Sequence, residues 1–224
     1  MTKNITILLL ILSIQMSGQD NHCFCELNSL MNNGSISCDT LRLKNNSTIF
    51  WQYNCDSIWL TLENINGRKT IIDNVPVELY GYAYRLGSEL IKEFDKALLF
   101  RNDCSANGPC SYSLLDKNNG RLKREFDQLI CIDTDMNQKD PHAYDLDFVV
   151  YLSDSTDYLI IFYVNSGKTL KVPFKQKLTA PIPQQQFEEM HLDNNILTLV
   201  YELDNGKKQT FKIDLDNQKY ITGQ

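Results

Sequence analysis

The chain has 224 residues, a formal net charge of −6 and 42% apolar residues. This acidic balance argues against a nucleic-acid partner, because such partners require a basic face on the protein. The apolar content is slightly below the globular norm of about 45–50% and fits a β protein that keeps one sheet face in water.

The first 18 residues have the layout of a secretory signal peptide. Lys3 is followed by an apolar run and then by small and polar residues up to Gly18, which is the order expected of such a signal. The apolar run is too short for a bilayer span, which needs about 20 residues. We therefore predict a secreted or periplasmic protein that does not span a membrane.

Residues 19–46 are rich in Asn, Ser and Cys and predict an irregular, Cys-rich N-terminal arm. Within it, Cys38 can form a disulfide with Cys23 or Cys25. The same thiols, together with His22, could alternatively form a structural zinc site, but export favours the disulfide. The chain has seven cysteines, an odd number, so at least one stays free or pairs with another chain.

A three-strand pattern recurs four times after this arm. Each copy has an apolar strand, a polar turn, a second apolar strand, a turn with Gly and a third strand that opens on Lys or Arg. Dense or alternating Val, Ile, Leu, Tyr and Phe favour strands, and Asn-Gly or Ser-Gly turns suit tight hairpins. The copies, each a predicted β-meander, occupy about residues 47–72, 96–126, 148–174 and 188–215.

Each turn glycine is followed at once by a basic residue, most simply a solvated strand end that discourages edge pairing. The glycines are 53, 47 and 39 residues apart, which is the period of propeller blades or similar arrays of small sheets. They are Gly67, Gly120, Gly167 and Gly206.

We predict an all-β fold in which residues 47–224 form a single domain, a small propeller-like array of four antiparallel meanders. A two-sheet β-sandwich is the alternative. A fourth strand for the units could come from the connecting segments, which are residues 77–86, 128–135 and 175–189. The last of these segments also suits a linker. Residues 88–98 have apolar positions at both helical and strand spacing.

The cysteines of the repeat region also predict pairings. Cys104 and Cys110 flank the Asn-Gly-Pro of CSANGPC, which can turn the chain so that the two side chains meet, and we predict a disulfide between them. Cys131 lies in an apolar run and is interpreted as a buried thiol or as the partner of Cys55.

Residues for catalysis or metal binding do not form a recognisable motif. His191 has no nucleophile at a readable spacing and is interpreted as a strand-end histidine at the surface. His142 is interpreted as a loop residue among acidic residues. Asp133, Asp135 and Asn137 match the first ligands of a calcium loop, but the glycine and the final glutamate of such a loop are missing. We predict no catalytic residues, no metal and no cofactor.

The Tyr-rich run LYGYAY is the best candidate for a binding surface. Tyr80, Tyr82 and Tyr84 would face one side of a strand, either for binding or for packing between units. We predict an exported non-catalytic β-repeat module that binds a protein, a glycan or a cell-surface component. The alternatives are an exported hydrolase with acids converging from several repeats, and a structural or assembly subunit.

Overall fold

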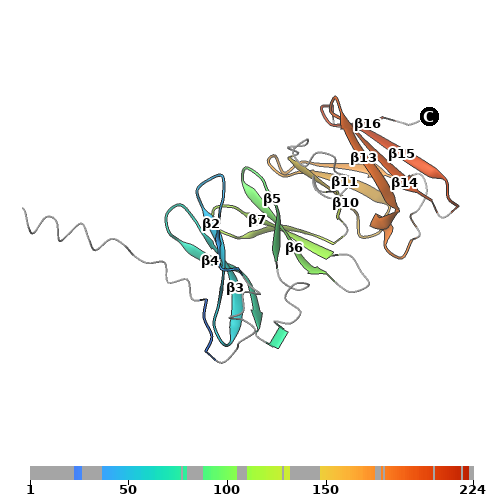
Figure 1. The fold of residues 1–224 in the computed structure, drawn as a ribbon. Coiled ribbons are helices and arrows are strands. Elements are labelled where there is room, and N and C mark those ends of the chain that lie inside the picture. Colours follow the sequence, from blue (N-terminus) through green and yellow to red (C-terminus); the bar gives the residue numbers. More distant parts are fainter. Residues whose placement is uncertain are drawn as a thin grey trace, which may run out of the picture.

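The computed structural model describes residues 23–26, 37–76, 78–79, 88–104, 110–127, 129–131, 147–174, 178, 180–203, 205–217 and 219–221. Four antiparallel sheets of four strands each make up the described chain (Figure 1). The predicted all-β, propeller-like array is thereby confirmed, and the sandwich alternative is not what the chain adopts. Among the described residues, no helix has the length and apolar character needed to cross a membrane.

The strands follow one another along the chain, four to a sheet. The first sheet contains β1 (Thr40–Arg42), β2 (Thr48–Tyr53), β3 (Ser57–Glu63) and β4 (Lys69–Pro76). The second contains β5 (Glu89–Glu93), β6 (Ala97–Cys104), β7 (Cys110–Asp116) and β8 (Leu122–Phe126). The third contains β9 (Leu129–Cys131), β10 (Phe148–Leu152), β11 (Tyr158–Tyr163) and β12 (Thr169–Pro173). The fourth contains β13 (Phe187–Asp193), β14 (Ile196–Glu202), β15 (Lys208–Asp214) and β16 (Lys219–Ile221), and a 3-10 turn, η3 (Pro183–Gln186), precedes it.

The predicted three-strand unit corresponds to β2–β4, β6–β8, β10–β12 and β13–β15. All four turn glycines have a φ angle between 69° and 74°, a left-handed conformation that glycine adopts without steric cost. The basic residue after each glycine is exposed, as expected of a solvated strand end.

The fourth strand of each sheet comes from outside the predicted unit. It precedes the unit in the first three sheets, as β1, β5 and β9, and follows it in the fourth sheet, as β16. Strand β9 lies in the predicted connector 128–135, whereas β1 lies in the segment expected to be an irregular arm. Strand β5 comes from residues 88–98, where the apolar pattern also suited a helix.

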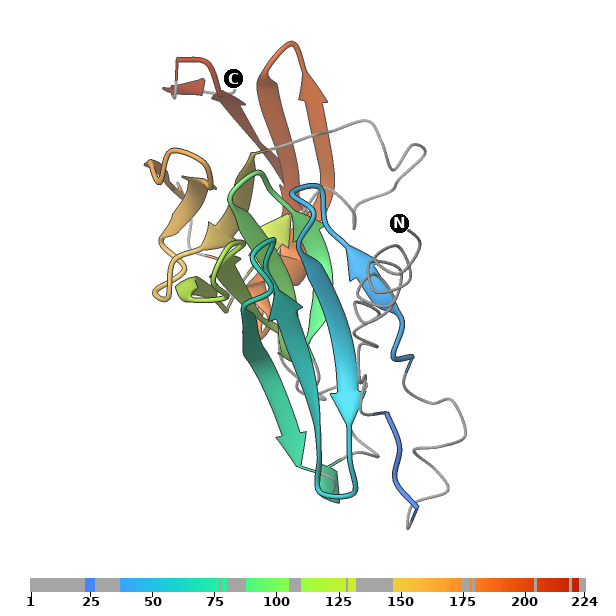
Figure 2. The same cartoon turned by 90° about the vertical axis from the view of Figure 1, so that its left-hand side faces the viewer.

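Neighbouring sheets pack face to face, so the two middle sheets are buried on both sides. In β10, Val149 and Tyr151 join the core shared with the second sheet, whereas Phe148, Val150 and Leu152 join the core shared with the fourth. A strand buried on both faces needs apolar residues at every position, which explains the continuous run FVVYL. The view turned by 90° shows the first two sheets in front and the fourth sheet beyond them (Figure 2).

The fourth sheet ends the array with a solvated face. Buried and partly buried residues alternate along β14, and its outward side meets polar strand positions such as His191 and Lys212. His191 is exposed and its Nε2 lies 3.1 Å from Glu189 Oε2, as predicted for a surface histidine. No buried apolar cluster of the described residues joins the first sheet to the fourth.

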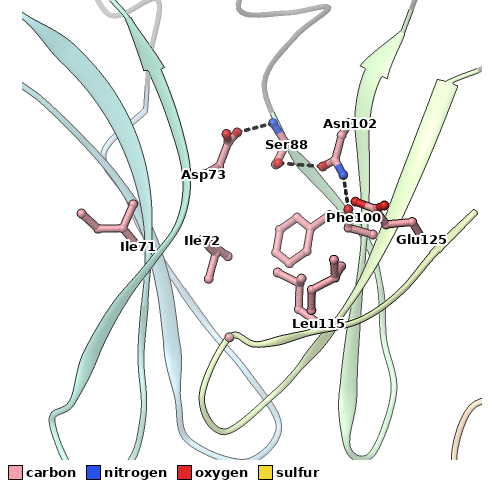
Figure 3. Close-up of a pocket in the computed structure, with 11 residues that line it drawn as sticks. Ile71, Ile72, Asp73, Ser88, Phe100, Asn102, Leu115 and Glu125 are labelled. Carbon is pink, nitrogen blue, oxygen red and sulfur yellow. Dashed lines mark hydrogen bonds between the residues drawn. The ribbon is translucent and has the colours of Figure 1, made fainter.

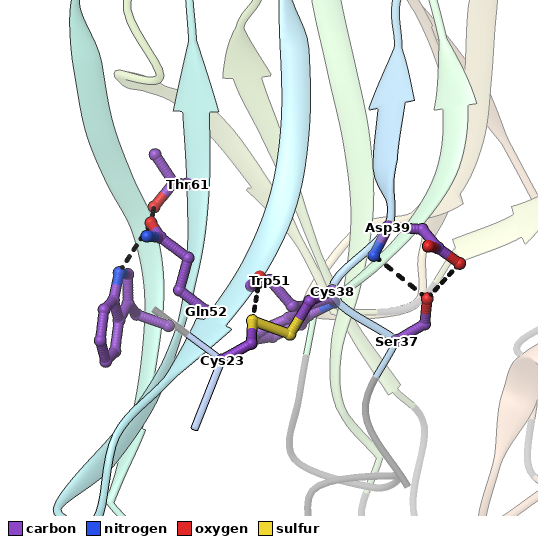
Figure 4. The surroundings of a disulfide bond; sticks show 8 residues. Cys23, Ser37, Cys38, Asp39, Trp51, Gln52 and Thr61 are labelled. Carbon is purple, nitrogen blue, oxygen red and sulfur yellow. Dashed lines mark hydrogen bonds between the residues drawn. A yellow bond between two sulfur atoms is a disulfide. The ribbon is translucent and has the colours of Figure 1, made fainter. Parts of the chain in front are cut away.

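One disulfide lies within the N-terminal arm, and a second attaches the arm to the first sheet. Cys23 pairs with Cys38 (Figure 4), and Cys25 pairs with Cys55. The first bond confirms one of the two predicted pairings of Cys38, and it uses thiols that a zinc site would need. The interpretation of Cys131 as the partner of Cys55 was wrong, because the arm brings Cys25 to Cys55 instead.

The arm covers one end of the inner face of the first sheet. Cys25, Tyr53 and Ile58 form a small buried cluster there, and Cys23 bridges the backbone of Tyr53. On the opposite face, the Gln52 side-chain oxygen accepts hydrogen bonds from Trp59 Nε1 at 3.0 Å and from Thr61 Oγ1 at 2.8 Å. The Cys25–Cys55 bond therefore attaches the arm to a sheet whose own strands are also joined by side-chain hydrogen bonds.

Candidate functional site: a cleft between the first two sheets

A cavity of about 350 Å³ opens between the first and second sheets. We call it the inter-sheet cleft. This volume lies at the lower end of the range of about 300–1,000 Å³ that is usual for ligand pockets. The cleft is lined by Ile71, Ile72 and Asp73 of β4, by Ser88, Phe100 and Asn102 beside and within the β5–β6 hairpin, and by Ser113, Leu115, Gly120, Leu122 and Glu125 of the β7–β8 hairpin (Figure 3).

The cleft lies where the outermost strands of two neighbouring sheets face each other. Strands β4 and β8 are the last strands of their sheets, and twisted sheets separate toward their edges. The gap is closed at one end by the turn that contains Gly120. A Cβ atom at Gly120 would come within 2.7 Å of Ile72 Cγ2 and 3.1 Å of Thr70 Cγ2, so only glycine lets this turn approach β4 so closely.

Apolar residues form the floor of the cleft. Phe100 and Leu115 are buried, and Ile72 packs against the same apolar cluster. In Figure 3, Ile72, Phe100 and Leu115 point toward the space between the two sheets, whereas Ile71 points away from it. A rigid apolar floor of this kind can support the apolar part of a ligand.

A chain of hydrogen bonds forms the polar wall of the cleft. The Ser88 backbone N–H donates to Asp73 Oδ2 at 2.9 Å, and Ser88 Oγ donates to Asn102 Oδ1 at 2.7 Å. Asn102 Nδ2 donates in turn to Ser113 Oγ at 2.5 Å. Because this chain runs from β4 through β6 to β7, it links the two sheets and fixes the orientation of the Asn102 amide.

Among the described residues that line the cleft, the charged side chains are all acidic. Asp73 and Glu125 lie on opposite walls (Figure 3), and the eleven lining residues include no Lys, Arg, His or Cys. The cleft therefore combines an apolar floor, an oriented amide, two serine hydroxyls and two carboxyl groups. This combination can bind a cationic or polyhydroxylated group by hydrogen bonds and charge.

A second, shallower pocket of about 250 Å³ lies on the fourth sheet beside Glu188 and Glu202. Lys208 Nζ lies 2.6 Å from Glu188 Oε2 and lowers the pKa of Glu188. The pKa of Glu202 is raised, because its carboxyl group shares a hydrogen bond with Glu188 and lies beside the negative charge of Glu188. These two acids belong to one repeat and an exposed face, whereas the hydrolase alternative requires acids that converge from several repeats.

The structure tests few of the sequence-predicted site residues. Tyr80, Tyr82 and Tyr84 lie outside the described residues. So do His22 and His142, together with the Asp133, Asp135 and Asn137 that resembled a calcium loop. Among the described residues there is no group of three His, Cys, Asp or Glu side chains that could hold a metal ion.

The register of the second sheet bears on the predicted Cys104–Cys110 disulfide. The two residues are directly opposite each other at the end of the β6–β7 hairpin, and Cys110 is disulfide-bonded. We therefore keep Cys104 as the proposed partner of Cys110.

Sequence reasoning missed the polar wall of the cleft. Asn102 and Ser113 interrupt apolar strands, and that interruption was the only local signal. Asp73 and Glu125 look like ordinary exposed strand residues. Nothing in the sequence indicates that residues 73 and 125 face each other, because the contact depends on how the first two sheets pack.

Comparison with known proteins adds little. No family model matches the chain, and no curated protein matches it. Three solved structures are similar over about four fifths of this chain. A puromycin hydrolase shares 10% identity with a TM-score of 0.35, and an uncharacterised protein of Listeria monocytogenes EGD-e shares 12% with a TM-score of 0.32. A mutant of the puromycin hydrolase complexed with PGG shares 12% with a TM-score of 0.33.

This chain spans 28%, 64% and 27% of the lengths of these three proteins, respectively. Similarity at this level assigns neither a family nor an activity. The fold class follows instead from the chain's own sheets, and the two disulfides fit a protein that folds outside the reducing cytosol.

Proposed function

We propose that the chain is an exported, non-catalytic β-repeat module that binds a protein, a glycan or a cell-surface component, and that the inter-sheet cleft is its binding site. The observation that carries the proposal is the cleft itself, where an apolar floor meets an oriented Asn102 amide and two carboxyl groups. Small-molecule and side-chain sites typically combine such a floor with a few placed polar groups.

Two features support export. The pattern of the first 18 residues predicts a signal peptide, and the bonds Cys23–Cys38 and Cys25–Cys55 belong to an oxidising compartment. We propose that residues 19–46 form an arm that the Cys25–Cys55 bond attaches to a single repeat domain, residues 47–224.

The chain connectivity brings the tyrosine-rich run into the same proposal. Residues 77–87 join β4 to Ser88, and Asp73 of β4 and Ser88 both line the cleft. We propose that Tyr80, Tyr82 and Tyr84 add contact surface near the binding site. Tyrosine suits this purpose because it is large, rigid and amphipathic.

Obstruction of the cleft tests the proposal. Glu125 lies exposed on edge strand β8, so Glu125→Trp should block the cleft without disturbing the core. The matched control is Thr210→Trp, an exposed strand position on the fourth sheet. The probes are a glycan microarray and a synthetic-peptide array, and the melting temperature of each variant is measured in parallel.

We expect wild type and Thr210→Trp to bind the same probes, and Glu125→Trp to lose them at an unchanged melting temperature. The proposal is wrong if no probe binds wild type, or if Glu125→Trp binds as wild type does. Turnover of fluorogenic glycoside or peptide substrates that disappears in Glu125→Gln would instead favour the hydrolase alternative.

A further inference from the structure

We infer that the ligand of the inter-sheet cleft is an extended peptide that pairs with the outer edge of β4 and places one Lys or Arg side chain in the cleft. The inference rests on the proposed function, since it names the ligand class of the same site. Three observations carry it: the single sign of charge among the described lining residues of the cleft, its apolar floor, and the edge position of β4.

The charge of the lining selects a cation. Asp73 and Glu125 bring two carboxyl groups to opposite walls, and none of the described residues that line the cleft is basic. Among the described residues, no salt bridge engages either carboxyl group. Asp73 Oδ2 accepts a hydrogen bond from the backbone N–H of Ser88. Hydrogen bonds between an ammonium or guanidinium group and a carboxylate are about twice as strong as neutral ones.

The floor selects a cation that carries an apolar stem. Ile72, Phe100 and Leu115 lie below the polar wall (Figure 3). Lysine and arginine bury three or four methylene groups along apolar surface while the charged head stays among polar groups. A small inorganic cation would leave this floor uncovered.

The edge strand selects a peptide as the source of the side chain. Strand β4 is the last strand of the first sheet and pairs only with β3 among the described strands. With eight residues it is longer than the neighbouring edge strand β8, which has five. An extended peptide can add to such an edge by main-chain hydrogen bonds, while its alternate side chains enter adjacent pockets.

The side chains on β4 favour the addition of an extended peptide to its edge. A register shift opposite Leu60 and Thr61 leaves Ile72 directed into the cleft. Ile71 is 61% exposed and points away from the cleft (Figure 3), so it can contact a neighbouring residue of the peptide. Lys69 and Pro76 protect the two ends of the strand against unspecific pairing, and no described strand pairs with the outer edge of its central residues.

A peptide series tests the inference. The probe is a fluorescein-labelled seven-residue peptide of alternating Thr and Val with a central Lys, compared with central Arg, Gln and Glu versions by fluorescence polarisation. Butylamine competes as a free cation. The variant is the double substitution Asp73→Asn with Glu125→Gln, in which Asn can still accept the Ser88 N–H. The control is Glu189→Gln with Glu202→Gln on the fourth sheet.

We expect the Lys and Arg peptides to bind at least tenfold more tightly than the Gln peptide, with the Glu peptide weakest. The double cleft variant should lose this preference and the control should keep it. Equal affinity for all four peptides, absence of peptide binding, or a preference that survives in the cleft variant overturns the inference. Butylamine that binds as tightly as the Lys peptide overturns the role of the β4 edge.

The two proposals fail in different ways. Glycan binding that Glu125→Trp abolishes, together with no binding of any peptide, leaves the cleft as a binding site and overturns only the peptide inference. Absence of binding to both arrays and to the peptide series overturns both.

Discussion

The contact between the Gly120 turn and β4 can be measured with a pair of glycine substitutions. Gly120 and Gly167 have nearly the same φ angle, 70° and 69°, and each ends the turn that leads into the last strand of its unit. They differ in their surroundings. A Cβ at Gly120 would lie 2.7 Å from Ile72 Cγ2, whereas nothing lies within 4 Å of a Cβ at Gly167.

Gly167→Ala should therefore report the backbone cost alone, which is about 1–2 kcal/mol for an L residue in the left-handed region. Gly120→Ala adds an overlap with Ile72 and Thr70. Both are β-branched and stiff at χ1, so they cannot turn aside easily, and overpacking of this kind costs about 1–3 kcal/mol more. For a protein of this size, that excess lowers the melting temperature by roughly 2–12 °C relative to Gly167→Ala.

The assay is chemical denaturation followed in parallel by far-UV circular dichroism and by tryptophan fluorescence. Both tryptophans, Trp51 and Trp59, lie in the first sheet, so their fluorescence reports the sheet that the Gly120 turn contacts. We expect Gly120→Ala to shift the fluorescence transition more than Gly167→Ala does.

Replacement of Ile72 by Ala removes the methyl group that the new Cβ would meet. The cost of Gly120→Ala should therefore be smaller in an Ile72→Ala background than in wild type, a non-additivity that a double-mutant cycle detects. Equal costs for Gly120→Ala and Gly167→Ala, or strict additivity with Ile72→Ala, would refute the packing of the first two sheets around the cleft.

Three further predictions concern a turn, the cysteines and a surface charge. Thr156 has a φ angle of 58°, so Thr156→Asn should stabilise the protein by about 0.5–1 kcal/mol in urea denaturation, because Asn tolerates this conformation better; an unchanged midpoint would count against strain there. If Cys104 and Cys110 are bonded, the unfolded, unreduced protein should contain one free thiol by titration, and three would contradict that pairing. Lys208→Gln should raise the pKa of Glu188, which Lys208 holds down, and a carboxyl-resolved NMR titration measures that pKa. Because the pKa of Glu188 is lower in the folded than in the unfolded protein, its ionisation stabilises the fold at a pH above the unfolded pKa, and this contribution is lost as the pH falls through the folded pKa. The substitution should make that loss smaller, and an unchanged pKa of Glu188 would refute the assignment.

The repeat was readable from the sequence because it depends on local rules. Turn glycines at positive φ and alternating or dense apolar strands are properties of a few consecutive residues, and all four units were placed close to their observed bounds. The additional strands β1 and β16 are only three residues long. Segments this short contain too few residues to show a period, so their pairing depends on an edge that the neighbouring strand offers.

For the disulfides and the cleft, too, part of the arrangement follows from the sequence and part only from the tertiary structure. The sequence limited Cys38 to two partners within the arm, but it left Cys55 open, and only the position of the arm on the first sheet brought Cys25 to it. Asp73 and Glu125 are 52 residues apart and belong to different sheets. Their approach depends on the packing of Phe100, Leu115 and Ile72 between those sheets.

The sequence by itself determined an acidic chain of four β-meanders with a turn glycine in each, because strand and turn preferences act over a few neighbouring residues. Only the tertiary structure decided which strands complete the sheets, which sheets face each other and where a cleft remains between them. The physical reason is that sheet-on-sheet packing depends on the summed shape of many side chains distant in sequence. The candidate site lies between two packed sheets, so no single stretch of the chain contains it.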